Sequence, residues 1–484
     1  MEELDIATVV KRSIRGVLAL VSRSIVIQGI SLLTALLLFG LLDESDIGIF
    51  AVVSASLAFL TYFSDIGLAA ALIQKKESLT TDDLRTTFTI QQILVVLLVL
   101  IAFLLSGFLG AMYHLNSEGI LLFQALVVAF FLASLKTIPS IILERNLQFE
   151  RLVLPQVFET LAFSGVVLYC AFHGYGIMSY TYAVLARGIV GLIAIYCIAP
   201  WRIGFTFSKS VARKLLSFGV PFQANSILAL LKDDLLTLYL GIVLPFAQVG
   251  YIGFAQKLAF TPLRLVMDNI IRITFPTFSR LAHEPTSLGK AIEKSLFVTL
   301  ALILPALTGV VILAPYLIEY VPKYQKWEPA LVALTFFAIN AAFSSLSTPL
   351  TNALNAIGKV KVTLYLMVFW TVLTWGITPL AIMQFGFNGV AYTSALVGTT
   401  AVIVVAVVRR YIQFRLGNII WVPLLATAIM GIVLFFISAI VITNIPMLFV
   451  AIGIGTVVYF GTLFALGKQH IIEDVRMIAL NLRK

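Results

Sequence analysis

Long apolar segments alternate with short polar loops along almost the whole chain. A helix of about 20 mainly apolar residues spans the hydrocarbon core of a bilayer, and most of these segments reach that length. Membrane-spanning strands are only about 10 residues long, and unpaired backbone groups find no hydrogen-bond partner in lipid, so these segments must be helices. The pattern predicts fourteen transmembrane helices, over residues 17–42, 47–73, 88–110, 118–135, 153–172, 177–199, 217–241, 248–278, 295–318, 329–350, 362–383, 387–408, 420–442 and 446–467.

The charges of the loops predict how the chain is oriented. Loops on one side of the membrane carry nearly all of the loop lysines and arginines, whereas those on the other side carry only Lys323 and Lys326. Because basic loops are retained on the cytoplasmic side, both termini are predicted to be cytoplasmic. The even number of spans independently agrees with that orientation.

Three pairs of short segments suggest an internal repeat. The segment GLLDESDIG at 40–48 resembles GIVLPFAQVG at 241–250, TIPSIILERNL resembles STPLTNALNAIG, and GIMSYTYA resembles GVAYTSA. The pairs occur in the same order at nearly one offset, which suggests two six-helix halves that share one orientation as a parallel repeat. We predict an N-lobe over residues 1–200, a C-lobe over 201–415, and a last part, 416–484, with spans thirteen and fourteen and a cytoplasmic tail.

Composition supports a membrane protein and excludes several functions. Hydrophobic residues make up 60% of the chain and charged residues 12%, against about 25% charged in soluble domains. The net charge of +10 is spread through short loops, with no patch suited to nucleic acid. The external loops are too short for a catalytic domain, and the chain lacks a phosphate-binding GxxxxGK[ST] motif, so it does not hydrolyse ATP. No cofactor is expected, and coupling to H⁺ or Na⁺ stays open.

Sulfur and imidazole ligands are few. The two cysteines, Cys170 and Cys197, fall near opposite membrane faces on this topology and cannot pair. The four histidines lie in loops or near helix ends without the spacing of a metal site. No metal site is predicted.

The eighth predicted span contains charges within its apolar sequence. At helical spacing, Lys257, Arg264, Asp268 and Arg272 fall on one face. An ion near the middle of a bilayer costs about 3 kcal/mol on insertion scales, so this face should meet protein or a wet cavity. Two other interpretations remain: Arg272 extends its charge to the surface, and Asp268 pairs with an arginine one turn away.

Other deep charges lie in spans one, two, five, six and seven. Lys232 and Asn225 share one face of the seventh span, and the carboxylate of Asp233 beside them suits an ion pair with Lys232 or Lys257. Arg187 has no carboxylate in its own segment and requires a partner from another helix. Purely structural ion pairs are an alternative interpretation of all these charges. The remaining deep charges are Arg23, Asp65, Glu159 and Asp234, which points away from the face of Lys232.

The balance of deep charge is positive and favours an anionic substrate. Guanidinium groups bind phosphate through two parallel hydrogen bonds, so a long amphiphile with a phosphate headgroup fits best. The candidate headgroup-binding residues are Arg23, Lys232, Lys257, Arg264, Arg187 and Asn225. The candidates for ion coupling or ion pairing are Asp65, Asp233, Asp268 and Glu159.

Several motifs resemble a known family. The segment GLLDESDIGIFAVVSASLAFLTYFSDIGLAAALIQKK at 40–76, and the later ERNLQFERL and LNAIGKVK, resemble the polysaccharide-transporter branch of the multidrug, oligosaccharidyl-lipid and polysaccharide exporter superfamily. The resemblance implies an all-α polytopic fold with two six-helix lobes forming a V around a central cavity, plus two C-terminal helices. Members carry cations in cavity-facing spans one, seven and eight, a role that Arg23, Lys232, Lys257 and Arg264 fit.

The same resemblance implies a function. Such proteins, which are transporters and not enzymes, move polyprenyl-phosphate-linked oligosaccharides from the cytoplasmic to the outer leaflet of the bacterial cytoplasmic (inner) membrane. The expected partners are that glycan lipid, membrane lipid and glycan polymerase machinery. A multidrug or organic-cation antiporter of the same superfamily is an alternative, although its cavity should be rich in carboxylates. A glycan polymerase or ligase would need a large external loop, and a scaffold would not need ions in mid-membrane.

Overall fold

The computed structural model describes residues 6–75, 77–224 and 227–481, and these residues form α-helices joined by short loops, without strands. They divide into two compact units, one ending at Gly250 and the other beginning at Tyr251. The boundary falls inside one long helix, α11, so the chain passes between the units without a linker.

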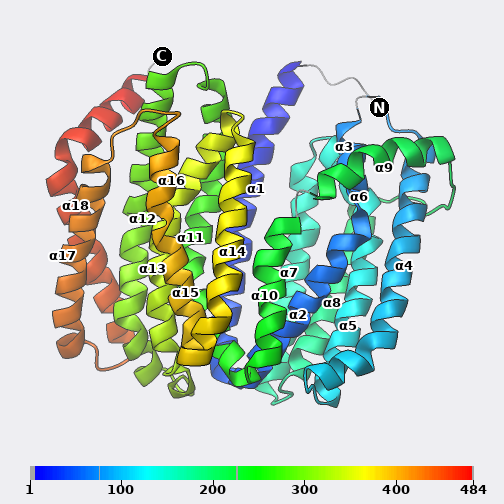
Figure 1. Ribbon diagram of the computed structural model, residues 1–484, viewed down its shortest axis with the longest axis horizontal. Helices are drawn as coiled ribbons and strands as arrows, with labels where there is room; N and C mark the ends of the chain where they lie inside the picture. The colour runs from blue at the N-terminus through cyan, green and yellow to red at the C-terminus, as the bar shows by residue number, and fades with distance from the viewer. Residues whose placement is uncertain (1–5, 76, 225–226, 482–484) are drawn as a thin grey trace. The chain divides into compact units, whose positions relative to one another are not determined.

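The first unit is a bundle whose long helices pack side by side. Figure 1 shows α4, α5, α7 and α8 running alongside one another. Its helices are α1 (Ile6–Leu41), α2 (Glu44–Asp65), α3 (Leu68–Gln74), α4 (Thr81–Met112), α5 (Ser117–Ser134), α6 (Thr137–Arg145), α7 (Phe149–Phe172), α8 (Met178–Ile198), α9 (Lys209–Ala224) and α10 (Ile227–Val243).

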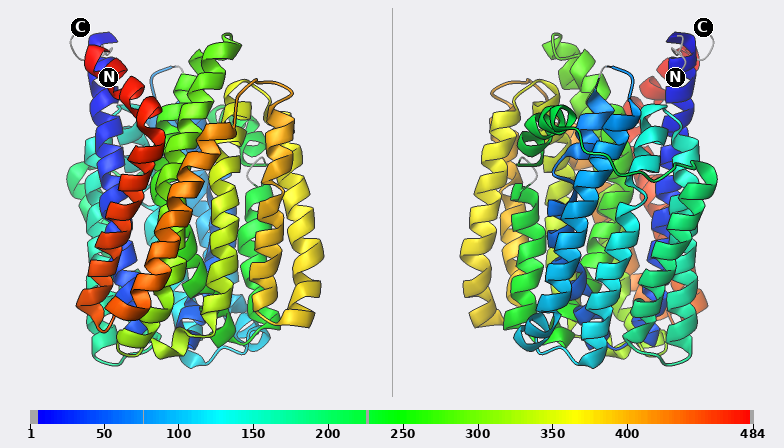
Figure 2. Two further views of the ribbon diagram at one scale, coloured as in Figure 1. Left: turned by 90° about the vertical axis from the view of Figure 1, so that its left-hand side faces the viewer. Right: turned by 90° about the vertical axis from the view of Figure 1, so that its right-hand side faces the viewer.

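The second unit is a bundle as well. Figure 2 shows α17 and α18 side by side, and both pack against α12, where the buried Tyr459 hydroxyl donates to the Ala301 carbonyl at 2.7 Å. The remaining elements are α11 (Phe246–Arg280), α12 (Pro285–Tyr320), the 3-10 helix η1 (Gln325–Trp327), α13 (Ala330–Ala356), α14 (Val360–Phe385), α15 (Asn388–Thr399), α16 (Ala401–Val408), α17 (Gly417–Val441) and α18 (Ile445–Asn481).

Eleven segments of the described chain are long and apolar enough to cross a membrane. They coincide with eleven of the fourteen predicted spans and confirm an all-helical, multi-pass membrane protein. The other three predicted spans are helical as well: they coincide with α2 and α3, with α9 and α10, and with α11.

The second predicted span is divided between two helices. α2 ends at Asp65, and Ile66 and Gly67 then adopt left-handed backbone with φ of 46° and 73° before α3 begins. A Cβ on Gly67 would lie 2.3 Å from the Gly219 carbonyl oxygen of α9, so backbone meets backbone here. The prediction of one continuous helix over 47–73 is therefore wrong. The segments on both sides of the turn are mainly apolar, so the hydrophobic pattern does not reveal that the backbone leaves the helical conformation at Ile66 and Gly67.

The seventh predicted span begins too early. Residues up to Ala224 belong to α9, which packs against α3 and α4, whereas α10 packs against α2. Figure 1 shows α9 lying across the ends of the bundle helices and α10 running along them. α9 buries Ala212 and Leu215 and exposes Arg213 and Lys214, the arrangement of a helix at a membrane surface.

Two segments that the internal repeat pairs are in direct contact within the first unit. A Cβ on Gly48 would lie 1.9 Å from the Phe246 carbonyl oxygen, and a Cβ on Gly250 would lie 2.0 Å from the Glu44 carbonyl oxygen. In each segment, the glycine thus packs directly against a backbone carbonyl of the other segment. Reciprocal contacts of this kind are the rule when two copies of one surface meet across a twofold axis.

Candidate functional site

The charged stripe of the eighth predicted span lies on α11. This helix continues through Lys257, Arg264 and Asp268 despite two internal prolines. Pro262 cannot donate to the carbonyl of Leu258, and the neighbouring Thr261 hydroxyl donates to the Lys257 carbonyl at 2.5 Å. The helix therefore stays continuous and keeps the charges at helical spacing.

Exposure differs along this stripe. Lys257 is half-buried, and Arg264, Asp268 and Arg272 are exposed. Lys257 and Arg264 lie two turns apart, about 10 Å along the helix axis. Among the described residues, neither of these two cations forms an ion pair, whereas Asp268 does interact with a neighbour. Lys257 and Arg264 thus have no carboxylate within ion-pair distance among the described residues.

A buried carboxylate joins three segments of the first unit. Glu159 on α7 is 9% exposed, and its Oε1 lies 2.5 Å from Lys136 Nζ. Its Oε2 lies 3.6 Å from Arg187 Nε on α8. Gly191 provides the space, because a Cβ there would lie 2.3 Å from Glu159 Oε1. The partner that Arg187 requires from another helix is therefore Glu159.

Lys136 is the member of this cluster that the sequence did not single out. It directly precedes α6, and the predicted topology placed it among the lysines of the cytoplasmic loops. Its side chain is instead only 17% exposed, against 57% for Arg187. No spacing rule links it to Glu159, because the two residues belong to different helices.

The family-like motifs meet at the loop between α3 and α4. Lys75 Nζ lies 2.6 Å from Asp83 Oδ2, and Asp83 forms a capping box with Thr80 at the start of α4. Arg145, in the ERNL motif, donates to the carbonyls of Leu72 and Glu77. Burial raises the pKa of the adjacent Glu144 carboxyl. These motifs position backbone and do not by themselves form a substrate site.

Other predicted site residues lie outside the part of the chain whose side chains the structure describes. They are Arg23, Asp65, Asn225, Lys232 and Asp233, so their roles stay predictions. Within the described part, no three His, Cys, Asp or Glu side chains are grouped so that they could hold a metal ion.

Comparison with known proteins identifies the family. Residues 37–332 match the family model described as polysaccharide biosynthesis protein. One relative, the lipopolysaccharide biosynthesis protein WzxC of Escherichia coli (strain K12), is 24% identical over 356 residues, which are 72% of this chain and 71% of the relative. The resemblance seen in the motifs is confirmed.

Solved structures share the fold. Lipid II flippase MurJ in an inward closed conformation matches with a TM-score of 0.75 and 14% identity, covering 93% of this chain and 99% of that chain. An inward-facing multidrug resistance MATE family transporter of the MOP superfamily matches with a TM-score of 0.63 and 16% identity, covering 81% of this chain and 97% of that chain. The chain belongs to the polysaccharide biosynthesis protein family.

Proposed function

We propose that this protein is a flippase that moves polyprenyl-phosphate- or polyprenyl-diphosphate-linked oligosaccharides from the cytoplasmic to the outer leaflet of a bacterial inner membrane. The observation that carries the proposal is the charge on α11. Lys257 and Arg264 lie within a mainly apolar helix, and no described carboxylate pairs with them. An anionic headgroup would supply the missing negative charge, and arginine suits phosphate geometry.

The family of the chain supports the same substrate class. WzxC is named for lipopolysaccharide biosynthesis and MurJ as a lipid II flippase, so a relative and a fold neighbour are named for glycan biosynthesis or lipid flipping. The glycan lipid delivered to the outer leaflet would then pass to glycan polymerase machinery. In this proposal the chain is a transporter without catalytic residues.

The proposed architecture has fourteen spans. α2, α10 and α11 would cross the membrane in addition to the eleven apolar segments, and two six-helix lobes would form a V around a central cavity. Their charges would be tolerated because they face that cavity rather than lipid. Both termini would be cytoplasmic. Rigid rocking of the lobes would then give alternating access to one site.

The proposed headgroup path begins at Arg23 and Arg264 on the cytoplasmic side. It then passes Lys257 and Lys232 as the lobes rock outward, while the prenyl tail remains in lipid beside α17 and α18. Coupling to H⁺ or Na⁺ would act through Asp65 or Asp233. We assign Glu159 to structure instead, because its carboxylate already binds Lys136 and Arg187.

Transfer of a fluorescent polyprenyl-diphosphate oligosaccharide across liposomes that contain the purified protein tests this proposal. A hydrogen bond to a charged group contributes about 1.5–3 kcal/mol, so Arg264→Ala should slow transfer about tenfold or more. Arg280→Ala is the matched control, because Arg280 lies in the last turn of the same helix and should leave the rate unchanged.

Two results would contradict the proposal. If Arg264→Ala and Lys257→Ala, both well folded, transfer at the parental rate, the headgroup does not follow α11. If the parental protein transfers no glycan lipid but exports organic cations, the protein is an antiporter of the same fold.

A further inference from the structure

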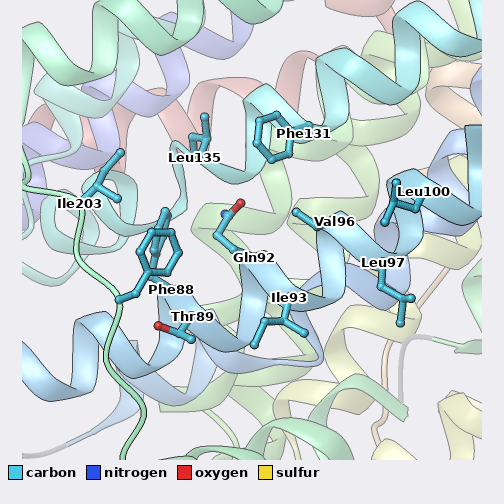
Figure 3. Close-up of a pocket in the computed structure, with 11 residues that line it drawn as sticks. Phe88, Thr89, Gln92, Ile93, Val96, Leu97, Leu100, Phe131, Leu135 and Ile203 are labelled. Carbon is cyan, nitrogen blue, oxygen red and sulfur yellow. The ribbon is translucent and has the colours of Figure 1, made fainter.

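An apolar groove lies on the first unit between α4, α5 and the segment 200–208. It has a volume of about 580 Å³, within the range of roughly 300–1,000 Å³ that small-molecule sites occupy. Figure 3 shows the side chains of α4 along one wall and those of α5 along another. The lining residues are Phe88, Thr89, Gln92, Ile93, Val96, Leu97, Leu100, Phe131, Leu135, Ile203 and Phe205.

The segment 200–208 is held against α4 and closes one end of the groove. Thr206 N donates to Thr89 Oγ1 at 3.1 Å, and Ser208 N donates to Thr86 Oγ1 at 3.2 Å. The Phe88 ring packs between Trp201 and Phe205, with ring centroids 5.0 and 5.5 Å away. This end of the groove is therefore built by specific contacts between the segment and the helix.

The interior of the groove offers hydrocarbon and little polarity. The amide of Gln92 is turned to Ser134, to which its Nε2 donates at 3.1 Å. Ile93, Leu97 and Leu100 remain 62%, 53% and 56% exposed. Flexible hydrocarbon is the natural occupant of such a surface in a membrane.

A cation lies at the closed end. Arg85 is one turn before Phe88 and Thr89 on α4, and it is half-buried over Gly204, where a Cβ would lie 2.5 Å from Arg85 Nε. Among the described residues, the ion pairs do not include Arg85. Its neighbour Asp82 is exposed, Arg202 adds a second exposed cation, and the Asp83 carboxylate is already bound by Lys75.

The dimensions match one leaflet of a membrane. From Phe88 to Leu100 the helix rises about 18 Å, a little over half of the roughly 30 Å hydrocarbon core. Arg85 lies about 5 Å beyond Phe88, which is where the phosphate of a lipid would be if its chain filled the groove.

We propose that this groove binds one anionic phospholipid of the surrounding membrane, with an acyl chain between α4 and α5 and its phosphate on Arg85. The apolar wall suits the acyl chain, and the Arg85 guanidinium, which pairs with no described carboxylate, suits the phosphate. Bulk phospholipid also outnumbers any other lipid anion, so mass action favours it. The site is separate from α11 and does not depend on the transport proposal.

Native mass spectrometry of the protein, purified from liposomes of equal phosphatidylglycerol and phosphatidylcholine with identical acyl chains, tests the inference. The parental protein should retain phosphatidylglycerol in preference. Arg85→Gln should lower that retention about tenfold, as expected for loss of a hydrogen bond to a charged group. Arg410→Gln, an exposed cation on the second unit, should leave it unchanged.

A second variant tests the hydrocarbon part. Leu97→Trp fills the groove from an exposed position and should reduce retention while Arg85 is intact. Equal retention of the two lipids by the parental protein, or normal phosphatidylglycerol retention in either variant, would overturn the inference. Preferential retention of added polyprenyl phosphate at equal concentration would also overturn it, since the groove would then belong to the glycan carrier.

Discussion

At the scale of single residues, the best-defined feature is the carboxylate of Glu159. It lies between Lys136, whose side chain is 17% exposed, and Arg187, whose side chain is 57% exposed. Removing one partner of a buried ion pair leaves an uncompensated charge and costs about 3–5 kcal/mol, whereas an exposed pair contributes about 1 kcal/mol or less. The two cations should therefore contribute unequally to stability.

The decrease in the free energy of unfolding caused by Lys136→Ala should be several times the decrease caused by Arg187→Ala. Thermal unfolding of the purified variants in one detergent measures the difference. Equal destabilisation by the two substitutions would mean that Arg187 carries as much of the pairing as Lys136 does.

Gly191→Ala should also destabilise the protein, by about 1–3 kcal/mol, because the new methyl group would overlap Glu159 Oε1. If that overlap is the cause, Gly191→Ala should cost little further stability when it is introduced into a chain that already carries Glu159→Ala. Strictly additive losses in the double variant would assign the effect of Gly191→Ala to another contact.

At the scale of elements, the apolar pattern predicts where helices lie but not where they break. Eleven spans coincide with apolar helices because length and hydropathy alone define them. The turn at Ile66 and Gly67 lies against the backbone of Gly219 in α9, a contact between distant residues that the apolar pattern does not reveal. For the same reason the sequence predicted a partner for Arg187 but not the contribution of Lys136.

Gly67→Ala should destabilise the protein by about 2–4 kcal/mol. An alanine at positive φ costs about 1–2 kcal/mol, and its methyl group would press on the Gly219 carbonyl. Gly107→Ala is the matched control, since Gly107 lies inside α4, five residues before its end, and nothing lies within 4 Å of the added Cβ; this variant should be stabilising by roughly 0.5–1 kcal/mol. A thermal scan that ranks the two variants in the opposite order would show that the α2–α3 turn tolerates a side chain.

At the scale of the whole molecule, the sequence predicted the class of protein and its family. Composition indicated a polytopic membrane protein, the short external loops left no room for an external catalytic domain, and the motifs pointed to the branch that the family model matches. In the structure those same motifs, including Lys75 and Arg145, hold loops in place. Residues that identify a family are thus often those that shape its backbone, whereas the candidate substrate residues on α11 were found from the cost of burying charge.

The reciprocal contact between Gly48 and Gly250 has a consequence for the origin of the chain. A surface that fits a rotated copy of itself requires only one ancestral sequence, so a half-length protein with this glycine could have paired with a second molecule of itself. Gene duplication and fusion would then join two subunits that already fitted together. Each half could afterwards acquire its own charges while the shared glycine contact was kept.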